Sequence, residues 1–64
     1  MRNSTVEIIR HTYDSFEVVA YDLFGRIVRH RMYCHGKKRK AWAIEQAALW
    51  AEELYLWVDP TIYH

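Results

Sequence analysis

Hydrophobic and polar residues alternate along three segments in the first half of the chain, residues 5–12, 16–23 and 26–35. Each segment is rich in β-branched and aromatic residues, and short stretches typical of turns separate them. Alternation with a period of two is typical of a β-strand that buries one face. The pattern therefore predicts three sequential antiparallel strands, with Gly25 last in a three-residue hairpin loop, where a left-handed backbone is needed.

The length of this loop also predicts the register of the second hairpin. Asp22 is expected opposite Arg26, and the pairs that follow are Ala20 with Val28, Val18 with His30, and Phe16 with Met32. One sheet face is then mostly apolar and carries Val6, Ile8, Phe16, Val18, Ala20, Val28, Met32 and Cys34. The other face carries Glu17, Val19, Tyr21, Ile27, Arg29, Arg31, Tyr33 and His35. A slip of one residue would invert this assignment.

Helical periodicity replaces the alternation from about residue 39 to residue 58. One broad apolar stripe is formed by Ile44, Ala47, Ala48, Ala51, Leu54, Tyr55 and Val58. Asp59 precedes Pro60 and predicts the stop, because a residue before proline disfavours helical geometry. The sequence therefore predicts one α+β domain over residues 1–64, a three-stranded antiparallel meander packed against a single C-terminal helix, with a short tail at 59–64.

The composition indicates a small domain of a reducing compartment. A chain of 64 residues has little core, and three Trp and five Tyr supply large apolar surfaces for it. Cys34 is the single cysteine, whereas small secreted domains usually depend on several disulfides. The longest apolar stretch, residues 54–58, is too short to span a bilayer. We therefore expect a cytoplasmic, intracellular protein with no membrane partner.

The charges are segregated although the net charge is only +1. Seven of the nine Lys and Arg residues lie between residues 25 and 40, and all eight acids lie outside that segment. Cations at the start of the expected helix oppose its dipole, and no Ser, Thr, Asp or Asn stands at the cap position. Local rules broken in this way are expected where function overrides stability.

The basic segment predicts a site for an acidic partner, either nucleic acid, with DNA favoured, or an acidic protein surface. The candidate binding residues are Arg26, Arg29, Arg31, Tyr21, Tyr33, His35, Lys37, Lys38, Arg39 and Lys40. The cations would hold phosphates, and the two tyrosines would contact sugars or bases. The alternative is a solvated loop and an ordinary polar sheet face, with Glu17 opposite Arg31 as a cross-strand ion pair.

A second helix stripe indicates a protein contact. Trp42, Leu49 and Leu56 follow one another at intervals of seven residues, opposite the expected core stripe. The simplest partner is a second copy, in a homodimer of antiparallel helices. Alternatively, the tail folds back and Ile62 and Tyr63 cover Leu56.

Metal binding and catalysis have little support in the sequence. His30, Cys34 and His35 lie on one strand, where adjacent side chains point to opposite faces and residues four apart are about 13 Å from each other. No nucleophile motif, phosphate loop or carboxylate pair is present. We expect no metal, no cofactor and no enzymatic activity, with RNA cleavage by His35 together with Lys37 or Tyr33 as the catalytic alternative.

A three-stranded meander followed by a helix, with a basic outer sheet face, resembles two families of small DNA-binding domains. These are the N-terminal domains of tyrosine recombinases and the plant AP2-type domains, which read the major groove with the sheet. The likeness covers strand order and the basic face only, and implies a nucleic-acid-binding accessory or regulatory protein. The rival hypothesis is a protein-binding module, such as a phage-type inhibitor or an antitoxin-like protein, that uses the helix stripe or a strand edge.

Overall fold

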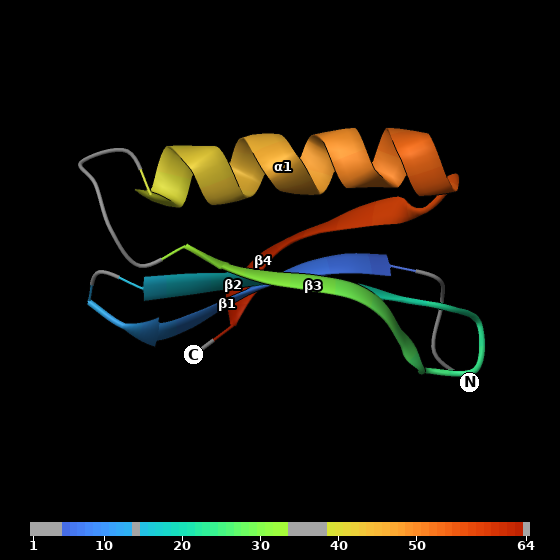
Figure 1. The fold of residues 1–64 in the computed structure, drawn as a ribbon, viewed down its shortest axis with the longest axis horizontal. Coiled ribbons are helices and arrows are strands. Elements are labelled where there is room, and N and C mark those ends of the chain that lie inside the picture. The colour runs from blue at the N-terminus through green and yellow to red at the C-terminus, as the bar shows by residue number, and fades with distance from the viewer. Residues whose placement is uncertain (1–4, 14, 34–38, 64) are drawn as a thin grey trace.

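The computed structural model describes residues 5–13, 15–33 and 39–63, and shows a small α+β fold with one helix on one face of a four-stranded sheet (Figure 1). The elements are β1 (Thr5–Thr12), β2 (Ser15–Tyr21), β3 (Ile27–Tyr33), α1 (Arg39–Leu54) and β4 (Trp57–Tyr63). The strand order is β3-β2-β1-β4, with β4 parallel to β1 and the other neighbours antiparallel. The predicted three-stranded antiparallel sheet with a C-terminal helix is therefore wrong in one respect, since a fourth strand follows the helix.

The helix ends four residues earlier than the sequence pattern predicts. Tyr55 adopts φ 56°, in the left-handed region, and the Leu56 N–H donates to the Ala51 carbonyl at 2.8 Å. This bond joins the second residue past the helix to the residue three positions before its last, as in a Schellman motif. The chain then leaves α1 and continues as β4, where Pro60 lies in an edge strand at an irregularity of the register. Proline is tolerated there because an edge residue need not donate to a neighbour.

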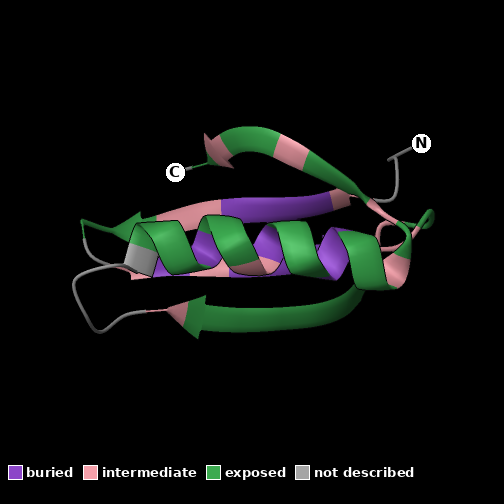
Figure 2. Ribbon diagram, turned by 90° about the horizontal axis from the view of Figure 1, so that it is seen from above, coloured by how far each residue is buried: buried purple, intermediate pink, exposed green. Residues whose placement is uncertain are grey.

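The core lies between α1 and the two central strands (Figure 2). Its buried residues are Val6, Ile8, Phe16, Val18, Ala20, Ala43, Ala47, Trp50 and Ala51. The expected apolar face of β1 and β2 is confirmed, because Val6 pairs with Ala20 and Ile8 with Val18. The alanines let the helix approach the strands closely, and Trp50 fills the space beside them. Within the expected helix stripe, Ile44, Ala48 and Tyr55 are exposed instead.

The β2–β3 hairpin begins as predicted and then departs from the predicted register. Gly25 has φ 79°, the Asp22 N–H donates to the Arg26 carbonyl at 2.9 Å, and Tyr21 pairs with Ile27. The register then shifts, because Val28 is an extra residue in β3 and Ala20 pairs with Arg29. A bulge of this kind exchanges the two faces of the strand beyond it.

The bulge overturns the face assignment of β3. Arg31 is opposite Val18 and Tyr33 is opposite Phe16, so Arg29, Arg31 and Tyr33 lie on the helix side of the sheet. Val28 and Met32, which the pattern predicts in the core, are 53% and 46% exposed. Cys34, expected in the core, and His35 lie outside the described residues.

In the part of the chain that the structure describes, no helix is long and apolar enough to cross a membrane.

Candidate functional site

The basic residues of β3 meet the flank of α1 along one side of the molecule. The core is built from β1, β2 and α1, and β3 adds only the partly buried Tyr33 to it. Figure 2 accordingly shows α1 lying along the middle of the sheet, with β3 exposed beside it. We call this surface the β3–α1 margin and define it by Arg29, Arg31 and Tyr33 of β3 and by Trp50 and Glu53 of α1.

Arg29 bridges the two elements of the β3–α1 margin. Its Nη1 donates to Glu53 Oε2 at 2.8 Å, and its guanidinium carbon lies 5.3 Å from the centroid of the Trp50 ring. Both charged side chains are largely exposed, so the ion pair contributes at most about 1 kcal/mol. The contacts mainly orient the guanidinium, whose other N–H groups remain available as donors.

Arg31 carries no ion pair among the described residues. Its guanidinium carbon lies over the Tyr33 ring, 5.6 Å from the ring centroid, in a cation–π contact. The Tyr33 hydroxyl is buried and has no hydrogen-bond partner in the described part of the chain. A buried hydroxyl without a partner costs about 1–3 kcal/mol. Among its described residues, the margin thus combines Arg31, a cation without an ion pair, with the Tyr33 hydroxyl, a buried polar group that lowers stability.

The start of α1 extends the positive charge of the margin. The first turn of α1 contains no acid and begins with Arg39 and Lys40, and the last turn contains no base. Lys40 is exposed. His35, Lys37 and Lys38 lie outside the described residues, as does the side chain of Arg39, and the chain passes through them between the end of β3 and the start of α1. The unfavourable placement of charge relative to the helix dipole, expected from the sequence, is confirmed for the described residues.

Arg26 and Tyr21 are not brought to the β3–α1 margin. Arg26 belongs to the hairpin loop, where its Nε donates to Asp22 Oδ2 at 2.9 Å and its guanidinium carbon lies 5.3 Å from the Phe24 ring centroid. Tyr21 follows Ala20 in β2 and pairs with Ile27, so it lies on the face away from the helix. The expectation that Tyr21 lies beside Arg29 and Arg31 is therefore wrong, because the bulge separates them.

The second helix stripe is shorter than predicted. Trp42 and Leu49 are half exposed, and their spacing from Glu53, eleven and four residues, places all three along one side of α1. Because Glu53 binds Arg29, this is the side that borders β3. Leu56 lies beyond the end of α1 and is partly buried against the core, so it does not belong to the stripe.

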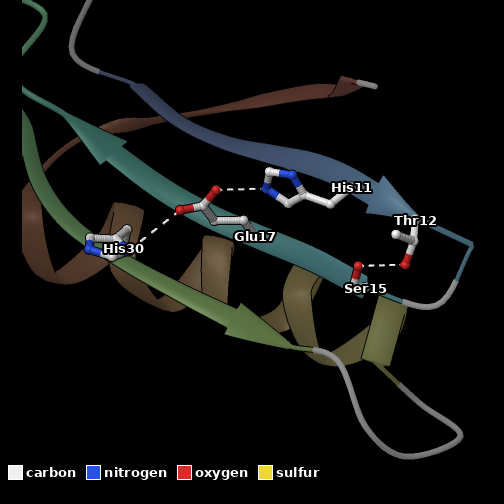
Figure 3. A network of polar contacts seen from close by, with 5 residues as sticks. All are labelled: His11, Thr12, Ser15, Glu17 and His30. Atoms are coloured by element: carbon white, nitrogen blue, oxygen red, sulfur yellow. Dashed lines mark hydrogen bonds and ion pairs between the residues drawn. The ribbon is translucent and has the colours of Figure 1, made fainter.

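Sequence reasoning missed a polar network on the face of the sheet opposite α1 (Figure 3). Glu17 contacts two histidines, with a hydrogen bond of 2.8 Å between its Oε1 and His11 Nε2 and an ion-pair distance of 3.4 Å between its Oε2 and His30 Nδ1. The expected Glu17–Arg31 pair is wrong, because Glu17 pairs with Met32. The alternation of β1 and β2 could have placed His11 beside Glu17, whereas His30 joins them only through the bulge. Among the described residues, no group of three His, Cys, Asp or Glu side chains is arranged to hold a metal ion.

The β3–α1 margin offers hydrogen-bond donors and positive charge, with the guanidinium groups placed over aromatic rings, and this arrangement suits an anionic ligand. Comparison of the chain with protein-family models, with curated protein sequences and with solved structures finds no match. Its function is therefore inferred from its own residues.

Proposed function

We propose that this protein is a small, non-enzymatic nucleic-acid-binding protein whose β3–α1 margin binds the phosphate backbone. One observation carries the proposal. A bulge in β3 turns Arg29 and Arg31 toward the helix side and leaves Val28 and Met32 exposed to solvent. Bulges are common next to functional sites, where they redirect side chains. An arrangement that leaves apolar side chains exposed lowers stability, and such arrangements are expected where they serve a function.

The arginines of the margin are suited to phosphate. A guanidinium presents a planar fork of donors that matches two phosphate oxygens, and stacking on an aromatic ring fixes its orientation before the ligand arrives. In the described structure, the donors of Arg31 do not contact any acid. The Glu53 side chain is 60% exposed, so it can rotate into solvent and leave Arg29 to bind a phosphate. Lys37, Lys38, Arg39 and Lys40 continue the positive charge along the sequence.

The expected mode of binding changes with the corrected fold. The DNA-binding domains that the sequence pattern resembles use the sheet face, but the described strand positions away from α1 carry no Lys or Arg. Contact through the β3–α1 margin depends on backbone charge, with the half-exposed Trp42 available to stack on an unpaired base. We therefore expect weak sequence preference and tolerance of single strands.

The test is fluorescence anisotropy of labelled duplex DNA and labelled single-stranded RNA, titrated with the wild-type protein, Arg31→Ala and Arg10→Ala. Arg10 is the matched control, because it lies in β1, which does not neighbour β3 in the sheet, and its guanidinium is over Tyr13 and Phe16 at the β1–β2 hairpin. Removing one phosphate contact costs about 1–3 kcal/mol, so Arg31→Ala should weaken binding at least five-fold while Arg10→Ala changes it less than two-fold. Absence of binding at low salt, or an equal loss in both variants, would contradict the proposal.

A protein-binding module is the second candidate, favoured by the sheet face that no helix covers in the described part of the chain. Ile27, Met32 and Trp57 are exposed on or beside that face. An apolar contact of this kind tolerates salt, whereas phosphate binding weakens steeply with it. Salt dependence therefore separates the two functions.

A further inference from the structure

Among the described residues, no helix or strand covers the face of the sheet opposite α1, and Val19 and Glu7 at its centre are nevertheless buried. We call this face the outer sheet face, and the strand register assigns it Thr5, Glu7, Ile9, His11, Glu17, Val19, Tyr21, Ile27, His30, Met32, Trp57 and Tyr63. Trp57 is 77% exposed, and Ile27, Met32 and Tyr63 are also large exposed side chains. They come from β3 and β4, so exposed apolar groups border the face on both sides of its polar centre. A second layer could bury apolar surface at both of these borders.

The polar groups of the outer sheet face already have partners within the chain. Both carboxylate oxygens of Glu17 contact histidines, and Glu7, which is buried, accepts from the Thr5 hydroxyl at 3.2 Å. Removing a polar group from water is costly mainly when it is left without a hydrogen bond. A second layer could therefore cover this face without stranding a carboxylate.

The charge of the outer sheet face argues against a polyanion as its partner and favours a second copy of the same face. Its described positions contain the carboxylates of Glu7, which is buried, and Glu17, which contacts two imidazoles, and Asp59 accepts from the hydroxyl of Tyr63 beside them at 2.6 Å, whereas no Lys or Arg is among these positions. A polyanion would therefore find no lysine or arginine to bind there. A second copy of the same face brings imidazoles and carboxylates together and matches apolar groups with apolar groups, as an isologous contact requires.

The size of the face is sufficient for a symmetric contact. Strands of seven residues at about 3.3 Å per residue, four of them about 4.8 Å apart, give a face of about 23 by 19 Å. Two copies would together bury roughly 900 Å², counted as flat area, which is in the range of weak, reversible interfaces below about 1,200 Å².

We propose that the outer sheet face is the interface of a homodimer, in which two sheets pack face to face with the helices outside. The dimer would be a four-layer α-β-β-α structure with the sheets about 10 Å apart. It differs from the antiparallel-helix dimer expected from the sequence, because Leu56 does not belong to the helix stripe. Both β3–α1 margins remain on the outside, so the interface is independent of the proposed nucleic-acid binding.

Sedimentation velocity of the wild type and two matched variants, over a concentration series, tests the dimer. Met32→Glu puts a charge on the outer sheet face beside Glu17, and Leu49→Glu puts the same charge on a similarly exposed apolar residue of α1. We expect a wild-type dimer with a dissociation constant on the order of 10 µM, little changed at high salt. Met32→Glu should be monomeric, and Leu49→Glu should remain dimeric.

Circular dichroism checks that each variant is folded. Trp57→Ser is a second variant expected to disrupt the dimer, and Trp57 is exposed enough to be replaced without loss of the fold. A wild type that stays monomeric throughout the series would overturn the proposal. A dimer lost in Leu49→Glu but kept in Met32→Glu and Trp57→Ser would overturn it as well, and would assign the contact to α1.

Discussion

At the scale of single residues, Asp22 shows how one side chain fixes a turn. Its Oδ1 accepts from the N–H groups of Phe24 and Arg26 at 2.9 and 3.0 Å, and its Oδ2 accepts from Arg26 Nε. The backbone hydrogen bond from Arg26, with those from Phe24 and the Arg26 side chain, lowers the pKa of Asp22 below its usual 3.8. The carboxylate therefore anchors the loop that begins β3.

The lowered pKa of Asp22 predicts how stability depends on pH. A group whose pKa falls on folding stabilises the native state above its unfolded pKa, and that contribution is lost as pH drops through the folded value. We expect Asp22→Asn to lower the midpoint of urea unfolding at pH 7 and to leave a smaller loss of stability between about pH 5 and pH 2. Glu45→Gln, at an exposed helix position, is the control. Identical pH profiles for Asp22→Asn and wild type would contradict this role.

At the scale of elements, the end of α1 depends on a residue poorly suited to its backbone. Tyr55 is almost fully exposed and adopts φ 56°, a conformation that Gly reaches without steric cost. Tyr55→Gly should raise the free energy of unfolding by about 0.5–1 kcal/mol. Ala48→Gly, within the exposed face of α1, should lower it by about 1 kcal/mol. Urea unfolding measures both, and a destabilised Tyr55→Gly would contradict the observed helix end.

The same elements show what could be predicted from the sequence. The alternation identified β1 and β2 and their buried face, and the Gly25 loop was placed correctly because a left-handed position in a short hairpin leaves few alternatives. The start of α1 also followed from local composition. These features depend on neighbours in the chain.

The features that were missed depend on contacts between distant parts of the chain. β4 exists because β1 offers an edge with which Trp57 and Val58 can pair, and helical periodicity alone continued through both residues. The bulge at Val28 cannot be read from the alternation, since the pattern of β3 favours the register without a bulge, with Val28 and Met32 in the core. The β3–α1 margin was therefore predicted in its cations but assigned to the wrong face, and the network of Glu17 with His11 and His30 was missed.

At the scale of the whole molecule, the two sides of the sheet have different chemistry. The helix side carries the core and, along the β3–α1 margin, cations held against aromatic rings. The outer sheet face has no described Lys or Arg and carries exposed apolar groups around a satisfied polar network. In the two proposals made above, this division places the binding of a polyanion on one side of the sheet and the dimer contact on the other.

The most direct test of the central claim is the salt dependence of nucleic-acid binding by the wild type and Arg31→Ala, measured by anisotropy on one labelled strand. Each phosphate contact releases counterions, so the logarithm of the binding constant falls linearly with the logarithm of salt concentration. We predict a steep wild-type slope, which Arg31→Ala reduces by about 1. Binding that does not respond to salt, or a slope unchanged in Arg31→Ala, would contradict phosphate binding at the β3–α1 margin.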